Sequence, residues 1–186
     1  ASRELAGYYA MIENLDWNIG RLLTALEQLP QFRDNTLTIY FSDHGDFMGT
    51  HGAINRKEHP HEQSVRVPAI FHWPGRIPAQ GTRCGCLFSL VDLFATTLGL
   101  LDLEIPVYSQ GADFSALIRG EQGFAGPKAV LLEMSGSPRW NFDHHDWRGL
   151  VTERWKYAVY DTGHELLFDL VQDPHEAQNL APRAPA

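Results

Sequence analysis

The chain has 186 residues and a formal net charge of −8, and 44% of its residues are hydrophobic and 20% charged. These proportions are ordinary for a globular protein of one domain, or of one domain with an appendage. The acidic balance argues against a general nucleic-acid-binding protein, which would need a basic face. No apolar run approaches the roughly 20 residues that span a bilayer.

The first part of the chain switches between helical and extended patterns. Apolar side chains recur at intervals of three and four over residues 3–29, which predicts an amphipathic helix that Pro30 ends. Residues 36–41 and 67–72 each predict an apolar strand, and residues 87–101 predict a second helix. Helix, strand, loop, strand and helix in this order are typical of α/β sheet units.

The last part of the chain is extended. Residues 102–128 are rich in Gly and Pro, so connections dominate there. Four strands are then predicted, over residues 129–134, 150–152, 155–160 and 166–170, and the middle two form an antiparallel hairpin. A helical turn or cap is expected at Asp173.

A carboxylate and an imidazole follow the first predicted strand in the tetrapeptide Ser42-Asp43-His44-Gly45. Ligands and metals collect beyond the carboxyl ends of strands in open α/β sheets. Asp43 and His44 are therefore candidates for two ligands of one divalent cation. The tetrapeptide is equally compatible with an Asx-type turn that contains an incidental histidine.

The residues after this tetrapeptide favour an anion-binding metal site. Four of the nine histidines lie here, together with cationic side chains that suit an anionic ester. The candidate residues of this segment are Asp43, His44, Asp46, His51, Lys57, His59, His61, Glu62 and Arg66.

These segments resemble the signature of the sulfatase family in the alkaline-phosphatase superfamily, and the resemblance covers nearly the whole chain. The matching stretches are residues 8–16, 41–46, 49–52, Lys57, 62–68, 89–93 and 157–180. The resemblance implies an α/β fold, with part of an alkaline-phosphatase-like sheet flanked by helices. Residues 1–125 would be the carboxy-terminal part of that α/β domain. Residues 126–186 would be a small antiparallel β subdomain with a terminal helical turn.

The resemblance also implies metal-dependent hydrolysis of sulfate esters, or of phosphonate or phosphate esters in close relatives. The substrate would be a small anionic ester, such as a sulfated sugar or an aryl or alkyl sulfate. The family's cation is usually Ca²⁺, with Mn²⁺ or Zn²⁺ in some relatives. By position, Asp43 and His44 match two metal ligands, and His44 is similar to the phosphonate-ester-hydrolase branch. Lys57 matches the lysine that binds a non-bridging oxygen of the ester.

Further site residues are expected near Lys57. Arg56 would add positive charge for the substrate. His51 and His61 are candidates for acid work, because imidazole titrates near neutral pH. The His59-Pro60-His61 stretch departs from the family pattern, which often has a tyrosine between the lysine and the glutamate.

The family's nucleophile is a formylglycine made from Cys or Ser in a Cys/Ser-x-Pro/Ala-x-Arg motif. Cys84 and Cys86, the only cysteines, are not followed by that pattern. The formylglycine is therefore expected upstream of this chain, which would carry about half an active site and be inactive alone. The alternative to both ester hydrolases is a non-catalytic metal- or anion-binding module. Exposed apolar edges would allow association into a homo-oligomer.

Other residues allow two interpretations. Cys84 and Cys86 fit a metal site or a disulfide, or simply small residues at the start of a buried strand or helix. Residues 141–147 are either a loop over the active site or a polar surface loop. Within them, Trp147, like nearby Trp140, is a candidate for stacking on a sugar or aryl group. His72 is expected to be a satisfied buried histidine.

Overall fold

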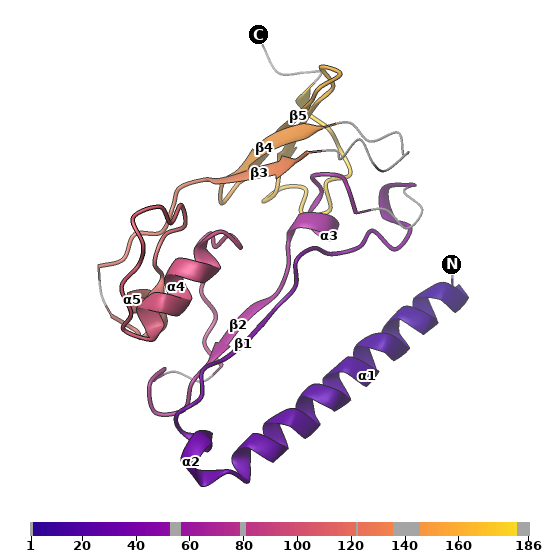
Figure 1. Ribbon diagram of the computed structural model, residues 1–186. Helices are drawn as coiled ribbons and strands as arrows, with labels where there is room; N and C mark the ends of the chain where they lie inside the picture. The colour runs from indigo at the N-terminus through magenta and orange to yellow at the C-terminus, as the bar shows by residue number, and fades with distance from the viewer. Residues whose placement is uncertain (1, 53–56, 79–80, 122, 136–145, 182–186) are drawn as a thin grey trace.

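The computed structural model describes residues 2–52, 57–78, 81–121, 123–135 and 146–181. A long amino-terminal helix, a two-stranded ribbon with short helices beside it, and a four-stranded sheet follow one another along the chain (Figure 1). Among the helices that the structure describes, none combines the length and the apolar character needed to cross a membrane.

The amino-terminal helix, α1 (Ser2–Glu27), follows the predicted spacing. The helix ends at Glu27. Pro30 begins the next short helix, α2 (Pro30–Arg33). Proline suits a first helical position, where the missing N–H would have no partner anyway. None of the described side chains of α1 is buried, and its apolar stripe is open. Such an uncovered apolar stripe marks an interaction surface. The exposed apolar residues of α1 are Leu5, Tyr9, Met11, Ile12, Leu15, Trp17 and Leu22.

The two-stranded ribbon pairs β1 (Thr38–Phe41) with β2 (Ala69–His72) in antiparallel register. Phe41 faces Ala69, so the connecting residues 42–68 leave and return at the same end of the ribbon. This connection contains the single turn η1 (Thr50–Gly52) and the short helix α3 (Glu62–Val65). His72 is exposed rather than buried as predicted, since three of the four β2 residues face solvent.

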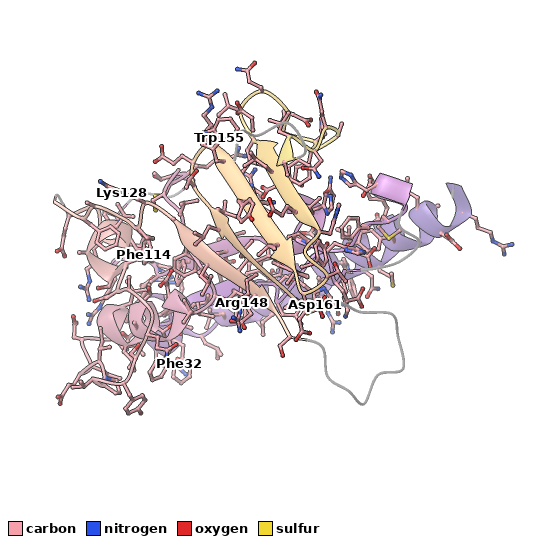
Figure 2. The ribbon with its side chains drawn as sticks, turned by 90° about the horizontal axis from the view of Figure 1, so that it is seen from above. Phe32, Phe114, Lys128, Arg148, Trp155 and Asp161 are labelled. Carbon is pink, nitrogen blue, oxygen red and sulfur yellow. The ribbon has the colours of Figure 1, made fainter. Side chains whose placement is uncertain are left out.

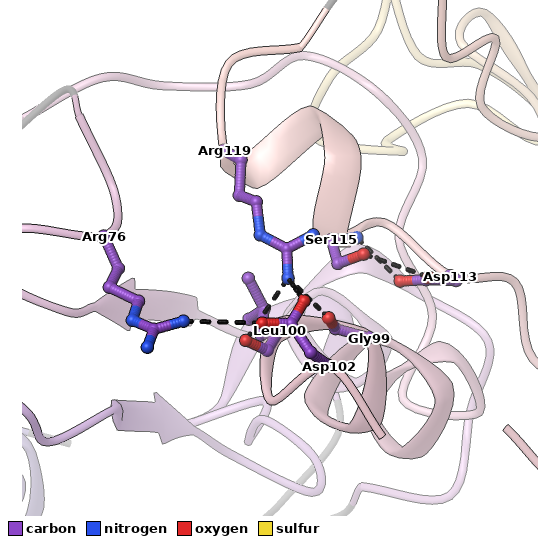
Figure 3. Close-up of polar contacts among 7 residues, drawn as sticks. All are labelled: Arg76, Gly99, Leu100, Asp102, Asp113, Ser115 and Arg119. Atoms are coloured by element: carbon purple, nitrogen blue, oxygen red, sulfur yellow. Dashed lines mark hydrogen bonds and ion pairs between the residues drawn. The ribbon is translucent and has the colours of Figure 1, made fainter. Parts of the chain in front are cut away.

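Two further helices pack beside the ribbon, α4 (Asp92–Leu100) and α5 (Ser115–Ile118). The guanidinium of Arg119 donates to the carbonyl of Gly99 at 2.6 Å and pairs with Asp102 at 2.7 Å, as Figure 3 shows. A cation at the carboxyl end of α4 satisfies free carbonyls and complements the helix dipole.

Helix α4 begins later than the predicted residues 87–101, because Asp92 closes a turn in front of it. Its carboxylate accepts the amide of Ser89 at 2.8 Å and that of Ala112 at 2.8 Å. Asp92 therefore ties the start of the helix to the loop that leads to α5.

The carboxy-terminal strands form the antiparallel sheet that the family resemblance implied. The strands β3 (Val130–Met134), β4 (Trp147–Val151), β5 (Trp155–Tyr160) and β6 (Glu165–Asp169) pair in sequence order. In Figure 2, Trp155 lies at one end of this sheet and Arg148 and Asp161 lie at the other. The α/β fold with a small antiparallel sheet is thus confirmed, whereas the boundary at residue 125 stays a prediction.

One face of this sheet carries a compact apolar core. Its buried members are Trp147, Ala158, Leu166 and Phe168, which alternate along β4, β5 and β6. After β6 the chain turns at Asp173, whose carboxylate accepts the amide of Gln178 at 2.8 Å. Residues 173–178 form turns without a described helix, so Asp173 stabilises a turn there instead of beginning or capping a helical turn.

Candidate active site

Asp43 and His44 stand where β1 ends, in the open. The Asp43 side chain is 82% exposed, and its Oδ2 lies 3.6 Å from Nε2 of His44. Its other oxygen accepts the backbone amide of His44 at 2.9 Å. This hydrogen bond holds the pKa of the Asp43 carboxyl below its ordinary value. The carboxylate is therefore ionised at neutral pH and available to a cation.

The ring of His44 is oriented by its own backbone. Nδ1 lies 2.8 Å from the carbonyl oxygen of Gly45, which can only accept, so Nδ1 carries the proton. Nε2 then presents its lone pair, and Nζ of Lys57 donates to it at 2.8 Å. An imidazole whose other nitrogen donates to a carbonyl has the arrangement usual for a metal ligand. We call Asp43, His44 and Lys57 the exposed site group.

A glycine allows these residues to meet. The amide of Gly45 donates to the carbonyl of Ser64 at 2.7 Å, and a Cβ on Gly45 would lie 2.0 Å from the carbonyl oxygen of Gln63. No other residue fits so close to the α3 backbone. The Ser64 hydroxyl in turn donates to the carbonyl of Lys57. The chain thus brings Lys57 back to His44.

The predicted histidines His51 and His61 belong to a different cluster. Their ring centroids are 4.4 Å apart, and both rings meet the buried Phe47 edge-on, as His59 does. Burial, with the nearby charges of His51, His59 and Lys156, lowers the pKa of His61 to about 4. His61 is therefore neutral at pH 7 and suits accepting a proton rather than donating one.

A buried ion triad fixes the segment that follows Lys57. Nζ of Lys156 lies 2.6 Å from Oε1 of Glu62 and 2.7 Å from Oε1 of Glu176. The side chains of Lys156 and Glu176 are 1% and 0% exposed. Glu176 also accepts the amide of Glu62 at 2.7 Å. The triad joins α3, β5 and the turn after β6, and the sequence indicated none of these pairings.

Two more contacts attach the Lys57 segment to the sheet. The indole Nε1 of Trp147 donates to the carbonyl of Glu58 at 2.7 Å. Nδ1 of His59 lies 3.0 Å from the hydroxyl of Tyr160, and burial raises the pKa of that phenol to about 12. The expectation that Trp147 stacks on substrate is wrong, because its ring is buried in the sheet core.

Some predicted residues lie outside the described part of the chain. These are Arg56, Trp140, His144 and His145. Within the described residues, no three His, Cys, Asp or Glu side chains are arranged to hold one metal ion. The assignment of Asp43 and His44 as two metal ligands therefore stays a prediction.

Comparison with known proteins identifies relatives of this chain. The family model Sulfatase matches residues 1–103. An ulvan-active sulfatase of Formosa agariphila is 30% identical over 95% of this chain and 34% of its own length. This chain thus spans about a third of the curated relatives that it matches.

Solved structures give the same picture. A protein in complex with its substrate D-glucosamine-2-N,6-O-disulfate is 29% identical, with a TM-score of 0.83 over 94% of this chain and 35% of that one. A phosphonate monoester hydrolase of Agrobacterium radiobacter is 27% identical, with a TM-score of 0.83 over 95% of this chain and 37% of that one. The family match covers more than half of the chain and includes the exposed site group, so this chain belongs to the sulfatase family.

Proposed function

We propose that this chain supplies the cation-binding and charge-neutralising part of an active site that hydrolyses sulfate esters. The observation that carries the proposal is the exposed site group. At the end of β1, Nε2 of His44 lies 2.8 Å from the ammonium of Lys57 and 3.6 Å from the carboxylate of Asp43. A substrate that is both anionic and metal-bound needs these three kinds of group together.

Asp43 and His44 are two ligands of a divalent cation. The ionised oxygen of Asp43 favours Ca²⁺, and the nitrogen of His44 also suits Mn²⁺ or Zn²⁺. When bound, the cation supplies Lewis-acid stabilisation of the charge on the ester. Further ligands come from segments beyond the described residues.

Lys57 changes partner in this scheme. Nε2 of His44 has one lone pair, and Lys57 uses it in this structure. Lys57 therefore has to leave Nε2 before His44 can act as a metal ligand. The freed ammonium is then available to a non-bridging oxygen of the ester. Arg56, the preceding residue, would add a second positive charge.

Proton transfer remains assigned to His51 and His61. Because the pKa of His61 is about 4, we assign it to proton acceptance, and His51 stays the candidate acid. The nucleophile is the formylglycine of the family, which we expect upstream of this chain. The substrate we favour is a sulfated sugar, since the neighbour solved with a sulfated glucosamine covers 94% of this chain.

A phosphonate ester hydrolase is the second candidate. It is favoured by the histidine at position 44 and by the likeness to the phosphonate monoester hydrolase. The sulfatase reading is stronger, because the family model and the first relatives are all sulfatases.

The test compares aryl sulfate, aryl phosphonate and aryl phosphate as substrates of the natural protein, before and after removal of divalent cations. We expect aryl sulfate to be hydrolysed fastest, and Ca²⁺ to restore activity after chelation. Asp43→Asn should weaken Ca²⁺ binding by about tenfold or more in calorimetry. Asp34→Asn, another exposed aspartate, is the matched control and should bind Ca²⁺ normally.

Each contrary result has a distinct meaning. Faster turnover of the phosphonate would replace the sulfatase reading by the second candidate. Ca²⁺ binding without turnover of any ester would leave a non-catalytic binding module.

A further inference from the structure

We propose that Cys84 and Cys86 form a redox-active dithiol, which a small-molecule disulfide such as oxidised glutathione converts into an intramolecular disulfide. This proposal goes beyond the ester hydrolase and uses none of its residues. It would be a covalent modification site in the loop between β2 and α4.

The two sulfur atoms are already neighbours. Both cysteines are free, and their Sγ atoms are 2.7 Å apart. A disulfide bond is about 2.05 Å long, so only a small movement separates this contact from a bond. Gly85 lies between the two cysteines, and a Cβ built on it would meet no atom within 4 Å. No neighbouring group therefore crowds this turn. The expectation that these cysteines begin a buried strand or helix is wrong.

The loop holds the two thiols differently. Cys84 is exposed, whereas Cys86 is half-buried. A Cβ placed on Gly126 would lie 3.3 Å from Cβ of Cys86, so the backbone at residue 126 packs closely against Cys86. One sulfur is therefore fixed by packing, and the other meets solvent and a dissolved oxidant.

This difference sets the order of the chemistry. The amide of Cys86 donates to Sγ of Cys84 at 3.4 Å, and the sulfur of Cys84 is the exposed one of the pair. Burial, and then the hydrogen bond with Cys84, raises the pKa of the Cys86 thiol to about 12. Cys84 is consequently the thiol that attacks first, and Cys86 is the thiol that resolves.

The two steps balance. The Cys84 thiolate attacks one sulfur of oxidised glutathione, which forms a mixed disulfide and releases one glutathione thiolate. The Cys86 thiol gives its proton to the released glutathione thiolate, and its sulfur then attacks Sγ of Cys84 and expels the second glutathione as a thiolate, which takes a proton from water. Two protein thiols and one glutathione disulfide become one protein disulfide and two glutathione thiols.

The test equilibrates the natural protein with mixtures of oxidised and reduced glutathione, in the presence of a chelator. Free thiols are then blocked with N-ethylmaleimide and the protein is digested with trypsin. Cleavage after Arg83 and Arg119 places both cysteines in one peptide, residues 84–119. We expect this peptide to lack two hydrogens and to outnumber its glutathione adduct by about tenfold or more.

Cysteine variants and the unfolded protein distinguish the proposed disulfide from oxidation that does not depend on the fold. Cys86→Ser should accumulate the glutathione adduct on Cys84, and Cys84→Ser should react about tenfold more slowly. In denaturant the excess of disulfide over adduct should fall by about tenfold, because the fold no longer holds the sulfurs together. A stable adduct on Cys84 of the folded protein, or equal ratios in folded and unfolded protein, would overturn the proposal. The readout is mass, so failure here leaves the proposed ester hydrolysis untouched.

Discussion

Residues 57–62 connect the exposed site group to the buried ion triad. The two groups differ in how far their side chains are exposed to solvent. Asp43 is 82% exposed, whereas Lys156 and Glu176 are almost fully buried. Exposed ion pairs contribute little to stability and exchange partners easily. Buried pairs are strongly destabilising to break, because the remaining charge has no water to solvate it. The exposed site group can therefore accept ligands, whereas the buried ion triad fixes the backbone.

The largest expected effect comes from breaking the buried ion triad. Lys156→Ala should lower the free energy of unfolding by about 3–5 kcal/mol, since the fully buried carboxylate of Glu176 would lose its cation. Chemical denaturation measures this difference. The matched control is Arg148→Ala, which removes a 3.0 Å ion pair with Glu133 on the exposed side of the same sheet and should cost about 0–1 kcal/mol. Equal costs for the two variants would erase the distinction between the two groups.

Lys57 provides the opposite case. In the natural enzyme, Lys57→Ala should lower kcat by about 10²–10³-fold, because a cation that stabilises developing negative charge is lost. The free energy of unfolding should change by no more than about 0.5 kcal/mol, since Lys57 is exposed. Steady-state kinetics and denaturation of the same preparation check both statements. A near-normal kcat would remove Lys57 from the mechanism.

The His61 cluster supplies a pH-dependent test. The pKa of His61 is about 4 when folded, against 6.5 ordinarily, so the unfolded chain binds a proton first as the pH falls. The stability from this group is therefore complete above pH 6.5 and is lost as the pH falls towards 4. His61→Phe should flatten this dependence by on the order of 1–2 kcal/mol. His72→Phe, on the exposed face of β2, is the control and should leave the slope of stability against pH unchanged.

The smallest expected effect concerns one hydrogen bond, between the sheet and the segment that carries Lys57. Trp147→Phe keeps a ring in the sheet core but loses the donor to the Glu58 carbonyl, which should cost about 1 kcal/mol. Because Glu58 adjoins Lys57, we also expect a lower kcat with the sheet still folded. Trp155→Phe, on the same sheet but partly exposed, should change neither quantity. Loss of stability without any change in kcat would show that the sheet does not position Lys57.

The sequence predicted what depends on neighbours along the chain. The spacing of α1, the apolar run of β1 and the alternation of β5 and β6 all follow from local periodicity. Residues 42–45 stand at a strand end, as predicted, and the Lys57 position was indicated by the family resemblance. The first helix ends before Pro30, as predicted, whereas the short helix that begins at Pro30 was not predicted.

The remainder depends on residues far apart in sequence. Glu62 meets Glu176, 114 residues away, and Trp147 meets Glu58, 89 residues away. No local pattern indicates such partners. Trp147 was assigned to a substrate loop because β4 was predicted to start at residue 150, whereas the strand begins at Trp147 and turns the indole inward. A lysine between apolar strand residues, as Lys156 is, was the available signal for a buried ion pair.

The long separation between Glu62 and its partners also sets the order in which the molecule can be completed. During translation, Lys57 and Glu62 are synthesised well before Lys156, and Glu176 is synthesised later still. Contacts between distant parts of a chain form slowly, since a large loop must close first. The segment that carries Lys57 therefore lacks its anchor to the sheet until Lys156 and Glu176 have been synthesised. Its final geometry is reached only when β6 has paired with β5 and the turn that follows β6 has brought Glu176 to Lys156.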